Sequence, residues 1–224
     1  MQATSIATTE RAQCPLDTAA SSTEVLRIPY SHPRFAPTLK RMGLPADFNA
    51  HYIVHYCPTL DFYWQQTLID NSQKPQSTNT EKAHNRPADL PAYTRASEEA
   101  ILFRLIYGQH TPLKVFDFGM GDGTWIKGIS AYGMECHGFD VAAYSEIVAK
   151  KHGITFATLD SYPDNFFDII NAQEVLEHVP NPLAVTKLVA SKLKKGGIFK
   201  ISTPGDKKLA QKLSALKQGA YPSA

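Results

Sequence analysis

Residues 113–133 read LKVFDFGMGDGTWIKGISAYG, an apolar run joined to a helical pattern through three closely spaced glycines. The run at 113–119 is short and rich in aromatic and β-branched residues, which predicts a buried strand. The segment 123–133 predicts a helix that ends at a glycine. Glycines at such a turn let backbone N–H groups approach a ligand closely, and the dipole of the following helix points at the same place. The stretch therefore predicts a ligand site beyond the end of a buried strand.

Strand and helix patterns alternate on both sides of this stretch. Before it, four apolar residues at helical spacing predict one face of a helix: Ile101, Leu102, Leu105 and Ile106. After it, strands are expected at 135–140, 154–159, 166–172 and 198–203. Helices are expected at 141–153 and, interrupted at Pro180–Pro182, between the last two strands. Such alternation predicts an α/β fold, a doubly wound parallel sheet with helices on both faces.

The composition is that of a folded protein without a strong charge bias. Of the 224 residues, 43% are hydrophobic and 20% are charged, which excludes a wholly disordered chain, a collagen-like chain and a coiled coil. The net charge of +2 gives no argument for nucleic acid or an anionic membrane as partner. No apolar segment approaches the ~20 residues of a membrane span. Three scattered cysteines make no disulfide framework and the N-terminus has no secretory pattern, so the expected location is cytoplasmic.

Three regions differ in composition along the chain. Residues 1–25 are rich in Ser, Thr and Ala and predict a flexible tail. Residues 26–92 combine an aromatic, proline-rich part with a polar linker, and residues 93–224 hold the expected ligand-binding domain. The second region contains three potential zinc ligands, the two histidines one helical turn apart, where a structural zinc requires four: His51, His55 and Cys57. Four lysines predict the solvated face of a final helix: Lys207, Lys208, Lys212 and Lys217.

Two ligand classes fit the glycine turn. Asp140 closes the second expected strand, where a carboxylate can accept hydrogen bonds from both hydroxyls of a ribose. Nicotinamide dinucleotides use the pattern G-x-G-x-x-G, whose third glycine position is Thr124 here. The spacing in this chain is G-x-G-x-G, with Asp117 two residues before the first glycine. A NAD-dependent oxidoreductase is therefore an alternative that the spacing disfavours, and capping of strand ends is the purely structural alternative for both aspartates.

The acid before G-x-G-x-G, together with FDIINAQEVLEHVPNPLAV at 167–185 and LKKGGIFKIST at 193–203, resembles class I S-adenosylmethionine (SAM)-dependent methyltransferases. The branch most similar in these motifs includes the ubiquinone-biosynthesis O-methyltransferases. The resemblance spans roughly residues 95–205 and implies a Rossmann-like sheet with strand order 3-2-1-4-5. It also implies SAM as cofactor and methyl transfer to a small-molecule acceptor, with a hydroxyl slightly favoured over nitrogen or carbon.

The resemblance assigns cofactor-binding roles at the glycine turn and after the following strands. Gly119 and Gly121 match the family's glycines that pack against SAM, and Asp117 matches the acid that orients its methionine amino group. Asp140 matches the ribose-binding acid. Asp160 matches a position that contacts the adenine amino group.

The segment after the fourth expected strand holds the candidates for chemistry. Gln173 would lie near the methionine end of SAM. Glu174, Glu177 and His178 occupy positions i, i+3 and i+4, which share one face of the expected helix. Some members of the branch hold a divalent cation with E-x-x-E-H, so these three are candidate metal ligands, although a cation is not predicted. Glu174 and His178 are the candidate catalytic residues, with His178 as general base or, alternatively, as a cap before Pro180.

The family pattern continues past the fifth expected strand. Class I members add a helix and an antiparallel hairpin there, whereas about twenty residues follow Pro204–Gly205. This predicts an uncovered sheet edge. The alternatives are that the chain is truncated, that another segment, a homo-oligomer or another partner covers the edge, or that the chain is a reduced variant of the fold. The short remainder also leaves a non-catalytic or regulatory SAM-fold subunit as an alternative function.

Overall fold

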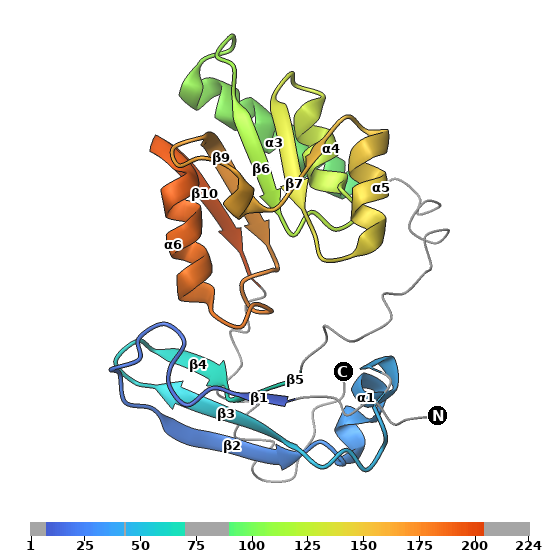
Figure 1. Ribbon diagram of the computed structural model, residues 1–224, viewed down its shortest axis with the longest axis vertical. Helices are drawn as coiled ribbons and strands as arrows, with labels where there is room; N and C mark the ends of the chain where they lie inside the picture. Colours follow the sequence, from blue (N-terminus) through green and yellow to red (C-terminus); the bar gives the residue numbers. More distant parts are fainter. Residues whose placement is uncertain (1–7, 43, 70–89, 204–224) are drawn as a thin grey trace. The chain divides into compact units, whose positions relative to one another are not determined.

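The computed structural model describes residues 8–42, 44–69 and 90–203. These residues form two compact units, one ending at residue 69 and the other beginning at residue 90 (Figure 1). Each unit is described by itself. The first seven residues, most of the expected linker and the expected final helix with its four lysines lie outside the described residues.

A five-stranded parallel sheet forms the centre of the second unit. Its strands are β6 (Lys114–Phe118), β7 (Glu135–Phe139), β8 (Thr155–Phe156), β9 (Phe167–Gln173) and β10 (Leu193–Ser202). Its helices are α3 (Leu90–Tyr107), α4 (Thr124–Ser130), α5 (Ala143–Lys151), the 3₁₀ helix η2 (Leu159–Ser161) and α6 (Pro182–Lys192). The strand order β8-β7-β6-β9-β10 is 3-2-1-4-5 in chain order, so the predicted α/β fold and topology are confirmed.

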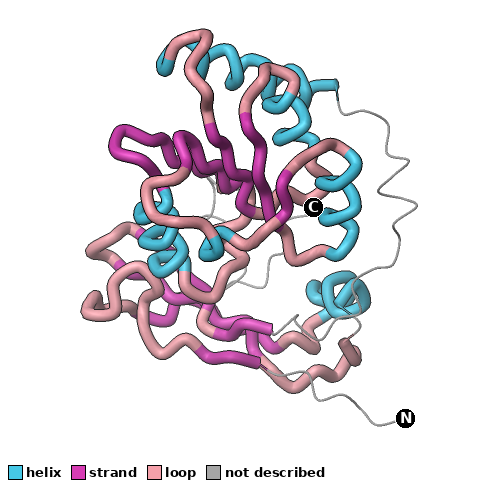
Figure 2. The backbone as a smooth tube through the Cα atoms, turned by 45° about the horizontal axis from the view of Figure 1, so that its top comes forward, coloured by secondary structure: helices cyan, strands magenta, loops and turns pink. Residues whose placement is uncertain are grey.

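Alternate residues of the strands face opposite helix layers. Val115 and Ile169, which are register partners, belong to a core with residues of α3, α4 and α5. Their neighbours Phe116 and Ile170 pack on the other side with Val189 of α6. Figure 1 shows α4 and α5 on one side of the sheet and α6 on the other, and Figure 2 shows the strands (magenta) between the helices (cyan). Most of the buried strand residues are apolar because both faces of the sheet are covered.

Helix α3 confirms the expected helix, but the apolar face that predicted it is not the buried one. The four side chains of that face are largely exposed: Ile101 49%, Leu102 51%, Leu105 71% and Ile106 55%. The buried residues are Ala96, Ala100 and Phe103. A Cβ atom added to Gly128 of α4 would lie 2.6 Å from the Cβ of Ala96. The small residues of the buried face let the two helices approach closely.

Two strands differ in length from the expected ones. Strand β8 is only Thr155–Phe156, because the chain enters η2 at Leu159. Strand β10 begins at Leu193, ahead of the Lys-Gly segment that was expected to precede it. Its pairing with β9 is irregular between Leu193 and Ile198, a stretch in which Gly196 has a φ of +81°.

The segment between β9 and α6 is a turn, so the expected helix over its first half is wrong. Glu174 has a φ of +53°, far from the right-handed helical region. The N–H of His178 donates to the carbonyl oxygen of Val175 at 2.9 Å, which closes a single turn. Helix α6 begins only at Pro182, after the Asn181 side chain caps it. The candidate catalytic and metal residues of this segment therefore do not share a helical face.

The first unit consists mainly of antiparallel strands. A three-stranded sheet has the order β2 (Thr23–Pro29), β3 (His51–Cys57), β4 (Phe62–Gln65). Strand β1 (Thr8–Glu10) pairs with β5 (Thr67–Ile69), and the 3₁₀ helix η1 (Pro33–Phe35) leads into α1 (Ala36–Met42). Residues 8–25, expected as part of a flexible tail, thus contain β1, the start of β2 and the fully buried Cys14. Within the described ranges, no helix has the length and apolarity needed to cross a membrane.

The three potential zinc ligands lie on a strand, so the expected helical spacing of the histidines is wrong. His51, His55 and Cys57 all belong to β3, and Cys57 is buried in a small core with Cys14 and Trp64. The ring of His55 stacks on Trp64 with centroids 4.6 Å apart. Over the part of the chain that the structure describes, no group of three or more His, Cys, Asp or Glu side chains is arranged to hold a metal ion. Cys57 packs the interior of the first unit and His55 is partly buried, whereas His51 is exposed.

Candidate functional site

The turn after β6 is attached to the end of β7. The N–H groups of Gly119 and Met120 donate to the carbonyl oxygen of Phe139 at 2.8 and 3.1 Å. Gly119, Gly121 and Gly123 have φ values of +80°, +52° and +70°. Residues with a side chain rarely adopt such values, so the three glycines determine the path of the chain at the predicted ligand site.

The glycines differ in their surroundings. A Cβ atom on Gly119 would clash with the Cγ2 atom of Val175. A Cβ atom on Gly121 would meet no heavy atom within 4 Å. Gly119 is therefore required for packing within the chain, whereas the backbone at Gly121 is open to approach from outside.

Asp140 holds this turn from the end of β7. Its Oδ2 atom accepts a hydrogen bond from the N–H of Gly121 at 2.8 Å, and its Oδ1 atom accepts one from the N–H of Ala142 at 2.8 Å. The hydroxyl of Ser145 donates to the carbonyl oxygen of Gly121 at 2.7 Å. The structure thus brings Asp140 against the glycine turn. Each carboxylate oxygen keeps further capacity to accept hydrogen bonds from hydroxyl groups.

Asp117 is buried on β6, two residues before the turn. It is 3% exposed, and the Nδ2 atom of Asn171 on β9 donates to its Oδ1 atom at 2.7 Å. Burial raises the pKa of Asp117 from 3.8 to about 7, while the Asn171 hydrogen bond and the charge of Lys200 act in the opposite direction. This carboxyl group can therefore change its charge near neutral pH.

Asp160 and Gln173 are exposed at the same edge of the sheet. Asp160 follows β8 in η2, and its hydrogen bond to the Thr158 side chain lowers its pKa, which keeps it ionised. Gln173 ends β9 and is the register partner of Ser202 on β10. Both side chains follow the carboxyl ends of parallel strands, where ligands bind in open α/β sheets.

The turn after β9 presents Glu174, Glu177 and His178 as exposed residues. The N–H of Glu174 donates to the carbonyl oxygen of Ser202 at 2.7 Å, which fixes the turn to β10. A left-handed φ at a residue with a side chain costs about 1–2 kcal/mol, and such strain is concentrated at functional sites. The three residues do not form a metal-binding group within the described residues.

Three residues that shape the site are not identified by the sequence analysis: Asn171, Val175 and Lys200. Asn171 leaves a detectable signal, because it is a polar residue inside the otherwise apolar strand FDIINA. Val175 and Lys200 leave none. Their contacts depend on how the strands and the turn come together, which local patterns do not encode.

Comparison with known proteins places the second unit within a described family. A family model described as "Methyltransferase domain" matches residues 81–223. The ubiquinone biosynthesis O-methyltransferase of Idiomarina loihiensis is 35% identical over 101 residues, which cover 40% of this chain and 42% of that protein. The protein of the same name from Marinobacter nauticus is 32% identical over 103 residues, covering 40% and 43%. The chain thus spans about two fifths of the length of these curated relatives.

Solved structures resemble the chain at lower sequence identity. The plantazolicin methyltransferase BpumL, in complex with SAH and a pentazolic desmethylPZN analog, has a TM-score of 0.48 and 17% identity, covering 63% of this chain and 58% of that chain. An S-adenosylmethionine dependent methyltransferase from Mesorhizobium loti has a TM-score of 0.40 and 26% identity, covering 50% and 54%.

Proposed function

The chain belongs to the methyltransferase-domain family, and we propose that it transfers a methyl group from SAM to the hydroxyl group of a small-molecule acceptor. The observation on which the proposal rests is the glycine turn at 119–123, which Asp140 holds through Gly121. Both curated relatives named above are O-methyltransferases, which supports oxygen as the acceptor atom. The match to a methyltransferase family argues against the alternative of a NAD-dependent oxidoreductase.

The residues around the turn fit the chemistry of SAM. The Asp140 carboxylate suits the two ribose hydroxyls, and the buried Asp117 carboxyl suits a positively charged amino group. The open side of Gly121 admits a ligand close to the backbone. Asp160 and Gln173 are exposed polar groups for the adenine and methionine ends. When bound, SAM supplies a methyl group that is activated by attachment to a sulfonium.

The chain's own task is to position the acceptor and to remove its proton. A hydroxyl group must lose its proton when its oxygen is methylated, and imidazole is the side chain best suited to accept a proton near neutral pH. His178 is exposed on the turn after β9, four residues along the chain from Glu174, whose φ is +53°. We assign the role of general base to His178 and that of orienting the acceptor to Glu174. The proposal includes no metal, because the described residues of this turn do not group as ligands.

Binding and transfer can be tested separately. Calorimetry of the purified chain with SAM and with S-adenosylhomocysteine should give saturable heat, and both ligands should raise the unfolding temperature. Transfer of a radiolabelled methyl group is then measured against a panel of phenols, catechols, amines and thiols. We expect product with the hydroxyl acceptors. Absence of SAM binding would refute the proposal, and transfer only to amines or thiols would refute the oxygen assignment.

The role of His178 needs its own comparison. His178→Ala should lower kcat roughly 100-fold or more while SAM affinity stays unchanged. The matched control is His110→Ala, since His110 is also exposed but lies between α3 and β6. Equal activity in the two variants would remove His178 from the proposal.

A further inference from the structure

A row of three polar side chains lies within the sheet beside the glycine turn. Asp117 on β6 is the register partner of Asn171 on β9, and Asn171 is the register partner of Lys200 on β10. Partners in a parallel sheet turn their side chains to the same face, and the residues two positions earlier pack toward α3, α4 and α5: Val115, Ile169 and Ile198. We call Asp117, Asn171 and Lys200 the polar row.

Asn171 occupies a position that an apolar residue would fill more favourably. Only 1% of it is exposed, and its Nδ2 atom donates to Asp117. Its Oδ1 atom is buried without a hydrogen-bond partner. Leaving a buried acceptor unpaired destabilises the folded state, so stability does not explain an asparagine here. The hydrogen bond to Asp117 explains why this position holds an asparagine.

Lys200 brings a positive charge to the same face of the sheet. Its ammonium group is 2.8 Å from the Glu99 carboxylate of α3 and 5.0 Å from the ring centre of Trp125. The indole N–H of Trp125 also donates to Glu99, at 2.6 Å. These contacts hold the end of the Lys200 side chain between α3 and α4, on the side of the sheet to which Asp117 points.

The charge of Asp117 is subject to opposing influences from four other elements or loops. Asn171 from β9 and Lys200 from β10 favour the anion. Burial, together with the negative charges of Asp140 after β7 and Glu99 of α3, opposes it. The row thus contains the two groups that counteract burial.

Among the described residues, Cys136 of β7 is a further titratable neighbour. Burial raises its pKa to about 12, so it contributes no charge near neutral pH. We propose that Asn171 and Lys200 are positioning residues for Asp117: Asn171 fixes the direction of its carboxylate and Lys200 stabilises its charge, so that it is an anion when the amino group of SAM binds. This inference rests on the proposed function for its ligand, but the behaviour of Asp117 itself can be tested without any ligand.

The first test follows Asp117 in the unliganded chain. The carboxyl resonances of a chain labelled with ¹³C-aspartate are titrated, and Asp117→Asn identifies the signal. We expect the titration midpoint to rise by about one pH unit in Lys200→Met and in Asn171→Leu, and to return toward the wild-type value in Lys200→Arg. The matched control is Lys194→Met. This variant also removes a lysine from β10, but the partner of Lys194 is Asp168. An unchanged midpoint in both row variants would overturn the inference.

The second test measures ligand affinity by calorimetry at pH 7. Lys200→Met should weaken SAM binding roughly tenfold, because the amino group of SAM loses an anionic partner. The affinity for 5′-methylthioadenosine, which has the nucleoside but no amino acid end, should change less than twofold. Equal losses for both ligands would indicate a general structural defect and contradict the positioning role. If neither ligand binds the wild-type chain, the proposed function fails, while the resonance titration still decides the inference.

Discussion

Burial of the Asp117 carboxylate opposes folding at neutral pH. Its pKa is about 7 in the folded chain and 3.8 without burial, so the ionised form destabilises the fold by up to about 4 kcal/mol above pH 7. We expect Asp117→Asn to increase the free energy of unfolding by roughly 1–4 kcal/mol at pH 8, measured by urea denaturation, and to abolish SAM binding. A gain in stability with a loss of binding is typical of a functional charge.

Asp164 provides the control for this substitution. Its side chain is 63% exposed and pairs with Lys192, so Asp164→Asn removes a carboxylate that burial does not destabilise. It should leave stability unchanged or slightly lower. The gain for Asp117→Asn should also shrink as the pH falls toward 5, where the wild-type carboxyl is protonated in the folded state. A gain of the same size at both pH values would contradict the burial argument.

Gly121 and Gly153 separate the cost of a left-handed backbone from the cost of blocking a ligand. Their φ values are +52° and +67°, and an added Cβ atom meets nothing within 4 Å at either position. Each change to alanine should therefore cost about 1 kcal/mol of stability. Only Gly121→Ala should weaken SAM binding, by roughly tenfold or more in calorimetry. Gly153 lies beyond the end of α5. If Gly153→Ala weakened SAM binding as much as Gly121→Ala, Gly121 would not be at the ligand site.

At the scale of elements, α3 has an exposed apolar face and a buried face of small residues that can be compared directly. Leu105 is 71% exposed and Ala100 is fully buried. We expect Leu105→Gln to change the free energy of unfolding by less than about 0.5 kcal/mol. Ala100→Leu should lower it by about 1–3 kcal/mol, because the added atoms do not fit between α3 and its neighbours. Urea denaturation of the two variants shows which face is buried, and a loss of about 2–5 kcal/mol in Leu105→Gln would mean that the apolar face is buried.

The sequence predicted the elements that local pattern specifies. Strands β6 and β9 are largely apolar runs that end at turns, and β7 has a weaker strand pattern. The glycine turn and Asp140 could be assigned from their spacing along the chain. The helix expected at Glu174 failed because the bond from its N–H to Ser202, and its left-handed φ, depend on β10. Asn171 has a clear role only when its strand lies beside β6. Long-range pairing, which periodicity does not encode, explains what the prediction missed.

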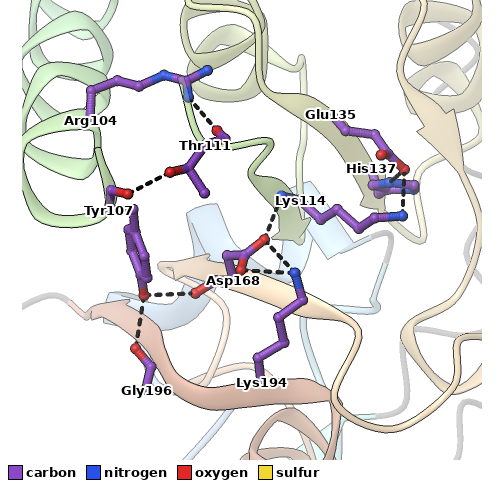
Figure 3. A network of polar contacts seen from close by, with 9 residues as sticks. All are labelled: Arg104, Tyr107, Thr111, Lys114, Glu135, His137, Asp168, Lys194 and Gly196. Carbon is purple, nitrogen blue, oxygen red and sulfur yellow. Dashed lines mark hydrogen bonds and ion pairs between the residues drawn. The ribbon is translucent and has the colours of Figure 1, made fainter. Parts of the chain in front are cut away.

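In the second unit as a whole, polar contacts connect the elements at one end of the sheet, and the candidate site lies at the other end. At the amino ends of the strands, the Lys194 ammonium contacts both oxygens of Asp168, and the N–H of Lys114 donates to the same carboxylate at 2.8 Å. The Tyr107 hydroxyl of α3 donates to the carbonyl oxygens of Asp168 and Gly196 (Figure 3). These contacts connect β6, β9 and β10 with α3. At the carboxyl ends of the strands, where the candidate site lies, the chain forms the glycine turn and the turn after β9.

Two buried groups in this unit should give its stability opposite dependences on pH. His137 is 5% exposed, and burial lowers its pKa below the ordinary value of 6.5. The unfolded chain therefore binds a proton at this residue more readily, so stability is lost as the pH falls below 6.5. Asp117 has a raised pKa, so the folded chain binds its proton more readily and stability is gained as the pH falls below about 7. Between pH 6.5 and 5 the two effects oppose each other.

Replacing one of the two groups should leave only the pH dependence of stability that the other group causes. Hydrogen exchange of the β6 and β9 segments gives the free energy of opening of this unit in the full chain between pH 8 and 5. Relative to the wild type, Asp117→Asn should lose stability as the pH falls from 6.5 to 5, whereas His137→Gln should gain it. The slopes matter here and not the absolute levels, because His137→Gln also removes hydrogen bonds to Tyr162 and Glu135. Slopes of the same sign in the two variants would mean that burial does not set the charge of these groups.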